Sequence, residues 1–518
     1  MRLSIWSVTL LYALTVLTLI LLRPLLPIDE TRYVAAAWEM HQGGPVFVPH
    51  LNGALYGHKP PLLFWLINLV WMVAGVSEFA ARLVAPAFAV ASVAATGVLA
   101  KRLWPDQPWR GGAAALILAV SPLFLLFGSS TMFDAMLGFA TLAAMLAIWK
   151  AATDPHRRAN WLWLGAAIAL GVYAKGPVIL IHVLPVALLM PLWAGRPQPK
   201  PGVWYRGVGL SILVALAFVA LWLLPSIILG GEAYRTEVLW RQSAGRMVSS
   251  FAHQRPFWFF LALLPLMLWP FGWTLRGLSS LRPAILSASP QTRMLVVWFL
   301  GALIIFSAIS GKQLHYIIPE LPALALLISG GLPARQWRAR DLWLALPVLL
   351  VLLVVLAAMT GNIADLQRME FRLPVWAGVL GILAFAAGAA AFLKLRSSTI
   401  ALAALPLALI VGLHFAASPL LFGHYDMRAL GKAVAPYDKS GIAVTDGTYH
   451  AQLNFAGRLT QPVARLGDPA SVERWRHEHP DGLLLDQSTD PLTGMRAIGT
   501  LPYRSGHYTL YRPKETAE

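Results

Sequence analysis

Long apolar stretches recur along this chain from its N-terminus to about residue 418. Hydrophobic residues make up 58% of the 518 positions and charged residues only 13%, which is about half the charged fraction of a typical soluble domain. A membrane-spanning helix needs roughly 20 mostly apolar residues, and the sequence predicts thirteen such spans. This composition excludes a soluble enzyme and a disordered chain, and the absence of cysteine excludes a disulfide scaffold. The predicted spans lie near 5–26, 80–100, 111–128, 133–149, 160–174, 177–194, 207–229, 257–275, 294–310, 317–332, 342–360, 374–393 and 399–418.

The positions of the basic residues predict how these spans are oriented. The chain has 41 basic and 24 acidic residues, a formal net charge of +17. If the N-terminus is cytoplasmic, the loops on that side carry Lys and Arg throughout, which is the positive-inside pattern. The apolar segment 61–77 cannot be a span, because it would move the basic loop 101–110 outside. We expect it to form a juxtamembrane helix on the outer surface.

The composition changes near residue 419, where charges return and strand-like runs begin. Residues 1–418 are predicted to form a transmembrane domain, with 27–79 as its first outer loop. An odd number of spans places the C-terminus outside, so 419–518 is predicted to be a soluble α/β domain on that face. Its strand signals are the runs 442–445 and 483–485 and a hairpin that turns at 504–506, between 497–503 and 507–511.

Ionisable and polar residues also lie at the predicted outer ends of the spans, where topology does not account for them. Such groups beside a membrane usually face a cavity or a partner. Three of them, Arg235, Glu237 and Arg241, are interpreted as solvated interfacial residues. The remaining candidates are Asp29, Glu30, Arg32, Tyr33, His58, Lys59, Asp134, Lys175, Arg246, Lys312, His315, Tyr316 and Glu320.

Two acids stand beside apolar spans in this set. On a helix that starts after the first span, Asp29, Arg32 and Tyr33 share one face at spacings i, i+3 and i+4. An alternative interpretation is that Asp29 only caps a helix running from 30 to 41. Asp134, directly before the apolar run 135–149, has the same two interpretations.

Three lysines lie at predicted outer helix boundaries. Lys59 precedes two prolines that force an extended backbone and then permit a helix to start. It therefore lies near the positive end of a helix dipole, where anions bind. Lys175 and Lys312 occupy similar boundaries. Carboxylates beside several cations suit group transfer from a phosphorylated donor, because a carboxylate can act as base toward an acceptor hydroxyl while cations stabilise the departing phosphate.

The segments that carry these residues resemble the bacterial lipid A aminoarabinose transferases. That family belongs, with the protein O-mannosyltransferases, to the polyprenyl-phosphate-dependent glycosyltransferases of the GT-C fold. The resemblance extends over nearly the whole chain, including thirteen spans and an outer C-terminal domain. The first-loop pattern is specific for the superfamily and says less about the sugar or the acceptor. The matching segments are 29–33, 49–53, 56–61, 130–134, 175–177 and 310–319.

The resemblance implies a role for each matched residue. Asp29 would activate the acceptor, and Asp134 would be the second acid of the site. Arg32 and Lys175 would be further polar residues of the same cavity. The lipid-linked phosphate would be held by Tyr56, Lys59, Arg246 and Tyr316.

Two positions depart from the family pattern. The family often has Glu where this chain has His58, and the aminoarabinose transferases have His where this chain has Ser243. Both positions belong to a metal site described for that subgroup. His58 is a candidate zinc ligand, but one partner is missing, so no cofactor is assigned and the metal is unknown.

The expected function is therefore an inverting glycosyltransferase of the bacterial inner membrane, working on the periplasmic face. It would move a sugar from undecaprenyl phosphate, or another polyprenyl phosphate, to lipid A or another envelope glycan. A protein O-glycosyltransferase of the same fold is the alternative within this class. A transporter or lipid flippase would show polar groups throughout the membrane depth and inverted repeats, and neither pattern is visible. Membrane lipids are expected neighbours, and nucleic acid is not an expected partner.

Overall fold

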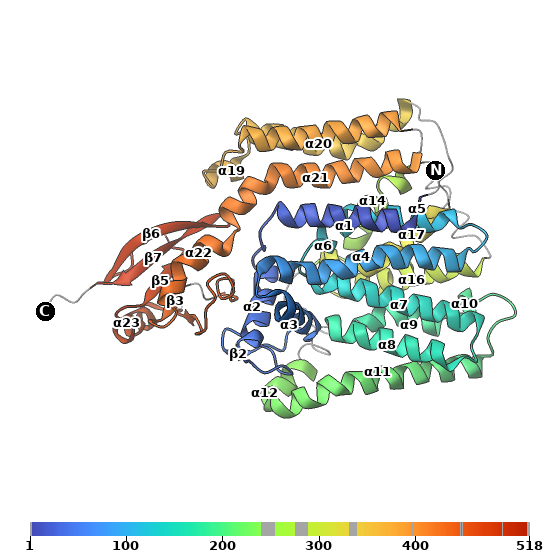
Figure 1. Cartoon of the computed structure of the whole chain (residues 1–518), viewed down its shortest axis with the longest axis horizontal. Helices are drawn as coiled ribbons and strands as arrows, with labels where there is room; N and C mark the ends of the chain where they lie inside the picture. Colours follow the sequence, from blue (N-terminus) through green and yellow to red (C-terminus); the bar gives the residue numbers. More distant parts are fainter. Residues whose placement is uncertain are drawn as a thin grey trace.

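The computed structural model describes residues 3–239, 254–274, 289–330, 339–395, 398–445, 447, 449–488 and 490–514. Most of the chain up to residue 424 forms apolar helices that run roughly side by side (Figure 1). Between the first and second of these lies a loop with two short helices and a two-stranded hairpin. The elements of this N-terminal half are α1 (Ile5–Leu21), α2 (Asp29–His41), β1 (His50–Leu51), β2 (Ala54–Leu55), α3 (Leu62–Ala74), α4 (Glu78–Leu103), α5 (Trp109–Ala119), α6 (Pro122–Gly128), α7 (Phe133–Thr153), α8 (Arg158–Lys175), α9 (Ile179–Leu188), α10 (Met190–Trp193), α11 (Pro201–Leu229) and α12 (Gly231–Thr236).

The second half continues the bundle and ends in a mixed α/β region. Its helical elements within the bundle are α14 (Phe259–Leu268), η2 (Phe271–Trp273), α16 (Pro290–Ala308), η3 (Leu314–Glu320), α17 (Leu321–Ser329), η4 (Ala339–Ala345), α18 (Leu346–Met359), α19 (Ala364–Arg368), α20 (Val375–Lys394) and α21 (Ser398–His424). The C-terminal domain that follows contains α22 (Met427–Val434), η5 (Ala435–Tyr437), β3 (Ile442–Val444), β4 (Ala464–Arg465), α23 (Pro469–Glu478), β5 (Leu483–Asp486), β6 (Met495–Tyr503) and β7 (Gly506–Pro513).

Each of the thirteen predicted spans contains at least one helix. By length and composition, seven helices of the described chain could cross a membrane, or eight if the pair α5–α6, bent by 68°, counts as one. The molecule is therefore a multi-pass membrane protein, while the count of thirteen stays a prediction. The apolar segment 61–77 contains the helix α3 of 13 residues, and its juxtamembrane position on the outer surface stays a prediction.

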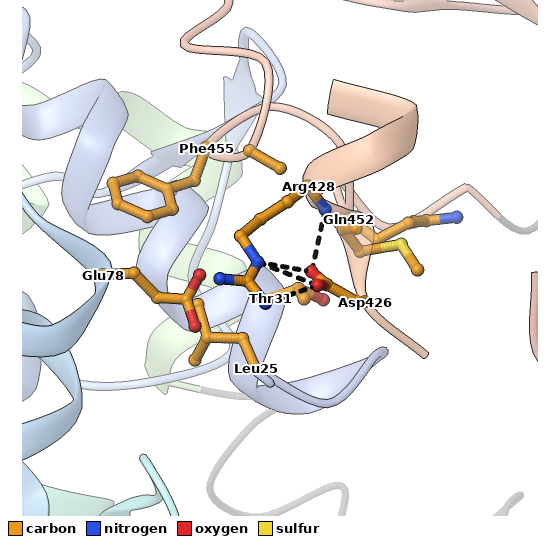
Figure 2. A pocket seen from close by; sticks show the side chains of 9 residues that line it. Leu25, Thr31, Glu78, Asp426, Arg428, Gln452 and Phe455 are labelled. Atoms are coloured by element: carbon orange, nitrogen blue, oxygen red, sulfur yellow. Dashed lines mark hydrogen bonds and ion pairs between the residues drawn. The ribbon is translucent and has the colours of Figure 1, made fainter. Parts of the chain in front are cut away.

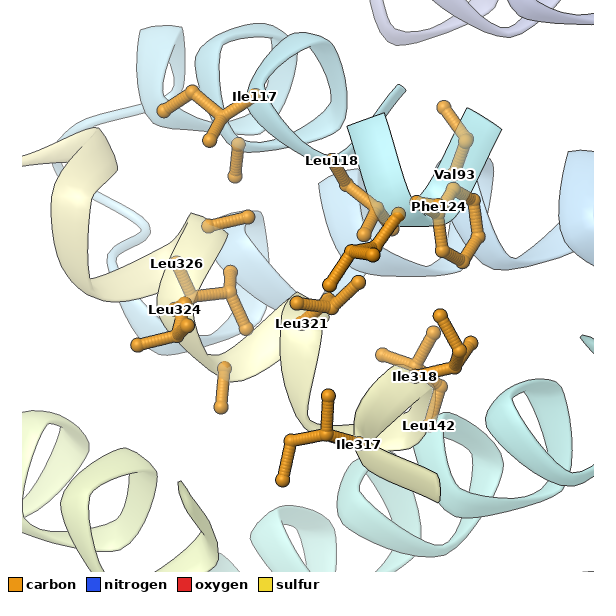
Figure 3. Close-up of a cluster of buried hydrophobic side chains, with 14 of the residues drawn as sticks. Val93, Ile117, Leu118, Phe124, Leu142, Ile317, Ile318, Leu321, Leu324 and Leu326 are labelled. Carbon is orange, nitrogen blue, oxygen red and sulfur yellow. The ribbon is translucent and has the colours of Figure 1, made fainter. Parts of the chain in front are cut away.

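Large apolar side chains from four neighbouring elements fill the interior of the bundle. Figure 3 shows Ile317 and Ile318 of η3 and Leu321 of α17 facing Phe124 of α6 and Leu142 of α7. Ile317 and Ile318 are essentially inaccessible to solvent. Because such close-packed side chains resist displacement, they fix the position of η3, a short element that also carries polar residues.

The C-terminal domain is built on a five-stranded sheet with the order β4-β3-β5-β7-β6. Strand β3 is parallel to β4 and β5, whereas β7 is antiparallel to β5 and β6. The predicted strands 442–445 and 483–485 and the hairpin around 504–506 are confirmed. The transmembrane helix before this domain continues to His424, a few residues beyond the predicted boundary at 418.

The first loop and the C-terminal domain lie at the same end of the helix bundle and contact each other (Figure 1). Trp38 of α2 donates its indole N–H to the carbonyl of Leu459 at 2.9 Å. The side chain of Asn52 donates to the carbonyl of Val463 at 2.9 Å and accepts from its N–H at 2.8 Å. The ring of Phe455 stacks on Trp71 of α3 with centroids 5.3 Å apart. These contacts join the two segments into one surface.

Candidate functional site

The carboxylate of Asp29 is held at the first turn of α2. Arg32 forms an ion pair with its Oδ1, and the Tyr33 hydroxyl donates to the same oxygen at 3.2 Å. The predicted shared face of these three residues is therefore confirmed. The N-cap of α2 is Ile28 and no side chain caps the helix, so the interpretation of Asp29 as a simple cap is wrong. Because the Asp29 side chain is 46% exposed, its carboxylate is accessible to a second molecule.

Aromatic rings line the site beside Asp29. Burial and the nearby Asp29 carboxylate raise the pKa of Tyr33 well above its ordinary value of 10.0, so its hydroxyl remains protonated and donates. The Tyr33 ring meets Phe133 edge-on, with centroids 4.8 Å apart. The Lys59 ammonium lies 5.9 Å from the centroid of Tyr33 and 5.6 Å from that of Phe133. Both rings therefore attract the ammonium by cation–π interaction.

The second acid, Asp134, lies in the first turn of α7 and is almost fully buried. The Lys175 ammonium, at the end of α8, donates to its Oδ1 at 2.5 Å, and the two side chains are only 2% and 12% exposed. The same ammonium lies 4.9 Å from the ring centroid of Tyr316. Asp134 therefore orients Lys175 toward the polar end of η3, and it has no open path to a second molecule comparable with that of Asp29.

His315 of η3 is an electrostatic neighbour of both acids. Its ring is close enough to Asp134, Lys175, Lys59 and Asp29 to interact electrostatically with all four. It also contacts the Tyr316 ring edge-on at 5.1 Å. The first loop, the α7 start, the α8 end and η3 thus bring their predicted residues together at one end of the bundle.

The loop before α3 adds a stacked pair to this cluster. The rings of Tyr56 and His58 are parallel within 5° and 5.4 Å apart. Tyr56 is buried and interacts electrostatically with Arg32. His58 is 51% exposed, with Nε2 3.7 Å from Oε1 of Glu237, whose side chain is 21% exposed. Glu237, interpreted from the sequence as solvated, is instead partly buried against the first loop.

His58 and Glu237 offer two groups to a metal ion. Structural zinc sites have four protein ligands and catalytic sites three. No group of three His, Cys, Asp or Glu side chains that could hold a metal occurs among the residues that the structure describes. The described residues thus supply an incomplete ligand set at His58, and no step of a reaction is assigned to a metal.

Glu30 points away from Asp29 into the protein interior. It forms a buried, two-point ion pair with Arg23, in which Nη2 lies 3.0 Å from Oε1. Its carboxylate also accepts the N–H groups of Leu26 at 2.9 Å and Thr131 at 2.6 Å. Burial alone would raise the pKa of Glu30, but the adjacent Arg23 charge keeps it below the ordinary value of 4.5. Glu30 therefore anchors the start of α2 to the turn before Asp134, rather than lining the cavity as predicted.

Lys312 also differs from its predicted role as a cavity residue. Its side chain is buried, and its ammonium donates to the backbone carbonyls of Arg255, at 3.1 Å, and Ile309. The lysine thus links the segment before α14 to the end of α16. Glu320, also a candidate, is fully buried and paired with His182.

Three residues of the sequence interpretation, Arg241, Ser243 and Arg246, lie outside the described residues. The predicted role of Arg246 at the donor phosphate stays a prediction. Arg235, on the short helix α12, is exposed, in agreement with its interpretation as a solvated residue.

Two residues that matter for the site were not singled out in the sequence. Phe133 forms an aromatic wall beside Lys59, and its only signal is its position directly before Asp134. Arg23 lies near the outer end of the first predicted span, 5–26, and no function was assigned to it from the sequence. An arginine at an outer, non-cytoplasmic end, with an acid seven residues later, was the signal that could have identified the pair.

Comparison with known proteins shows which molecules share this arrangement. A family model described as dolichyl-phosphate-mannose-protein mannosyltransferase matches residues 58–224. An undecaprenyl phosphate-alpha-4-amino-4-deoxy-L-arabinose arabinosyl transferase of Pseudomonas paraeruginosa is 33% identical over 358 residues, 67% of this chain and 62% of that protein. The protein of the same name from Pectobacterium carotovorum is 31% identical over 400 residues, 74% of this chain and 71% of that protein.

The fold also matches solved structures. The crystal structure of ArnT from Cupriavidus metallidurans bound to undecaprenyl phosphate has a TM-score of 0.74 to this chain at 15% identity, covering 98% of each chain. Its apo form gives a TM-score of 0.72, covering 97% of each chain. The chain therefore has the GT-C fold over nearly its whole length, although its sequence match spans only 62% of the first of the relatives above.

Proposed function

We propose that this chain, which belongs to the family of undecaprenyl phosphate-aminoarabinose arabinosyl transferases, transfers a sugar from undecaprenyl phosphate to lipid A. The observation that carries the proposal is the cluster at one end of the bundle, where an accessible carboxylate, Asp29, lies beside Lys59 and the Lys175–Tyr316 contact. The phosphorylated donor needs cations and the acceptor nucleophile needs a carboxylate, and the transfer needs both kinds of group side by side.

In the proposed reaction the acceptor oxygen attacks the anomeric carbon of the sugar in line with the leaving group. The new bond from that carbon to the acceptor forms as the bond to the phosphate oxygen breaks, so the configuration inverts and undecaprenyl phosphate departs. Asp29 orients the acceptor and takes its proton where the nucleophile is a hydroxyl. Arg32 holds this carboxylate in position through their ion pair.

The phosphate gains charge as it departs, and the cations must bind this state better than the bound donor to accelerate the step. We assign this role to Lys59, with Tyr56, Tyr316 and Arg246 as further donors to the phosphate. Lys175 is already paired with Asp134, so its contribution to the phosphate is smaller than that of Lys59. Asp134 thereby acts through Lys175 rather than on the acceptor.

We further propose thirteen spans in the bacterial inner membrane, a cytoplasmic N-terminus, and a periplasmic site covered by the C-terminal domain. The first loop and the C-terminal domain lie at the same end of the bundle and contact each other, which supports this arrangement. His58, with its Nε2 3.7 Å from Glu237, is the candidate zinc ligand, although the described residues add no third ligand to this pair. Measuring the metal content of the purified protein before and after chelation tests that site.

The function is tested with purified protein, undecaprenyl phosphate-linked aminoarabinose and lipid A, and the products are read by mass spectrometry. We expect lipid A to gain the mass of one aminoarabinose residue, only when the donor is present. Transfer to a protein hydroxyl in a parallel reaction, with none to lipid A, would instead support the protein O-glycosyltransferase. No transfer to either acceptor would contradict the proposal.

A further inference from the structure

A buried histidine–glutamate pair lies inside the helix bundle. His182 of α9 bonds Glu320, the last residue of η3, through Nδ1 and Oε1, and both side chains are inaccessible to solvent. Ionisable residues within apolar spans are costly and usually mark a functional site. The proposed reaction uses neither residue, so another role has to account for the pair.

The pair is an inefficient way to stabilise the bundle. Nε2 of His182 and Oε2 of Glu320 have no hydrogen-bond partner among the residues that the structure describes. Two apolar side chains of similar volume would avoid this cost, and replacing a buried ionic pair in this way is often neutral or stabilising. Stability alone therefore does not explain the pair.

An ion pair at the C-terminal domain shows the contrast. Arg428 is bonded to Asp426 where α21 meets that domain, with Nε 2.9 and 2.8 Å from the two carboxylate oxygens. Figure 2 shows the Arg428 guanidinium between the carboxylates of Asp426 and Glu78. The Arg428 side chain is 55% exposed, so water screens this pair and its contribution is small. Water does not screen the bond between His182 and Glu320, because both side chains are buried.

The buried pair and the candidate site use the same two segments of the chain. Lys175, at the end of α8, precedes His182 by seven residues, and Tyr316 precedes the last residue of η3 by four. The Lys175 ammonium lies 4.9 Å from the Tyr316 ring centroid. The ring centroid of Phe306, on α16, lies 5.3 Å from that of His182 and 5.8 Å from that of Tyr316. Side-chain contacts therefore hold η3 against the α8–α9 segment at two points.

A directional contact is needed to keep η3 in its orientation. It is a 3-10 helix of seven residues, although such helices have poor hydrogen-bond geometry and are usually shorter. Pro319 within it has no N–H to donate. The buried side chains of Ile317 and Ile318 hold η3 in the interior (Figure 3), but hydrophobic attraction is non-directional. The hydrogen bond to Glu320 is directional, so it determines how η3 is rotated and where the Tyr316 ring points.

We propose that His182 and Glu320 are positioning residues for the donor phosphate. Their bond fixes the rotation of η3 and thereby keeps Tyr316 beside Lys175, where its hydroxyl reaches the phosphate. The assignment rests on the proposed glycosyl transfer, in which Tyr316 binds the donor, and it adds two residues that act through Tyr316 without touching a substrate. Weakening the pair should therefore weaken donor binding and leave acceptor binding unchanged.

The test compares His182→Leu, Glu320→Leu and the double variant with the wild type. Each single variant leaves one polar group buried alone, so the melting temperature and the donor affinity should both fall. In the double variant two leucines meet, so the melting temperature should return to the wild-type value or exceed it. Its KM for the donor should stay about tenfold raised, the size of one hydrogen bond to a charged group, with an unchanged KM for lipid A. Recovery of the donor KM together with the melting temperature would overturn the proposal.

Two further variants test whether the bond acts through Tyr316. Glu320→Gln keeps a group that can bond Nδ1 of His182 and should retain most of the donor affinity. A loss as large as in the double variant would reject the role of the bond. Tyr316→Phe should raise the donor KM in the wild type but add little in the double variant, because residues that act as a unit are not additive. Fully additive effects would contradict an action through Tyr316.

The matched control for lost stability is Arg110→Met. Arg110 is buried and bonds Ser329 and the carbonyl of Leu326, both at 3.2 Å, so this variant disturbs the far end of α17, the helix that follows η3. It should lower the melting temperature and leave the donor KM unchanged. Arg428→Ala, which removes the exposed pair, should change neither. A donor KM raised as much in Arg110→Met as in the double variant would attribute the effect to general loosening and overturn the proposal.

Binding of undecaprenyl phosphate alone, measured without a sugar or an acceptor, separates this proposal from the proposed function. Weaker binding by the double variant than by the wild type supports the positioning role even if no transfer to lipid A occurs. Equal binding rejects the role whatever the transfer assay shows.

Discussion

The two acids of the cluster have different surroundings, and these assign them different roles. Asp29 is 46% exposed and accepts hydrogen bonds from neighbours on its own helix. Asp134 is buried and satisfied by Lys175 from another helix. A carboxylate that is already bonded to a lysine in the interior cannot take a proton from a large lipid acceptor. Asp29 is therefore the residue whose loss should stop the reaction.

Replacing Asp29 with asparagine keeps the size of the side chain and removes its charge. Because general base catalysis contributes about 10²- to 10⁴-fold, we expect transfer to fall by at least about 100-fold while the amount of protein in the membrane stays normal. The measurement is the initial rate of lipid A modification. Asp365→Asn, at an exposed position on α19, is the control, and near-normal turnover in Asp29→Asn would refute the role.

Lys59→Ala should act mainly on the donor. Its ammonium lies near two aromatic rings. Removing the side chain takes away a positive charge that would bind the donor phosphate, and it leaves the acceptor contacts in place. We expect the donor KM to rise about tenfold or more, consistent with the loss of a charged hydrogen bond, and Lys59→Arg to recover part of it. If the donor KM is unchanged in Lys59→Ala, the lysine does not bind the phosphate.

At the scale of elements, the helix α2 is held in place by contacts of Glu30 that the sequence of the helix does not predict. The i, i+3 and i+4 spacing allowed the contacts of Asp29 to be predicted, because they depend only on helix geometry. The role of Glu30 could not be predicted in this way, because its partners are Arg23 before the helix and Thr131, 101 residues away. Local periodicity carries no information about such a contact.

Glu30→Ala should destabilise the protein strongly, because it leaves Arg23 buried without its partner. Breaking a buried ion pair from one side costs about 3–5 kcal/mol, which can be measured by detergent titration of the purified protein. Because the pKa of Glu30 is lowered on folding from its ordinary 4.5, the pair stabilises the fold above pH 4.5 and loses that effect as the pH falls below it.

The control for Glu30 is the exposed pair of Arg368 and Asp365, whose side chains are 80% and 85% accessible. Removing Asp365 should change the free energy of unfolding by less than about 1 kcal/mol. A loss as small as this in Glu30→Ala would show that the buried pair does not anchor α2. An acid-induced loss of stability that persists unchanged in Glu30→Ala would have another origin.

For the whole molecule, the orientation in the membrane follows from the charge pattern and can be measured directly. The chain contains no cysteine, so single cysteines can be introduced without a background. We expect Lys439→Cys, exposed in the C-terminal domain, to react with a membrane-impermeant maleimide at the periplasmic face. Arg157→Cys, exposed between α7 and α8, should react only after the inner membrane is opened. The reverse pattern would invert the predicted topology.

The architecture was predicted in outline from the sequence, and the remainder depends on packing. The apolar stretches gave the helices, and the hairpin around 504–506 was visible in its turn residues. The C-terminal domain was predicted to be α/β, but the positions of the two-residue strand β4 and of the short helices α22 and α23 were not predicted. Tyr316 could be named as a candidate from the sequence, but its position over Lys175 depends on how η3 packs, and Ile317 and Ile318 of η3 are buried in the interior (Figure 3).

The bonds from α2 to Leu459 and from Asn52 to Val463 also constrain how the protein is made. The ribosome produces the first loop about 400 residues before the segment that it contacts. During that interval the surface around Trp38 and Trp71 lacks the Phe455 side chain that later covers it. This end of the molecule is therefore completed only after residues 455–463 have been synthesised. A nascent chain that is still being inserted would bind its lipids poorly, and premature termination after α21 would leave an inserted but inactive bundle.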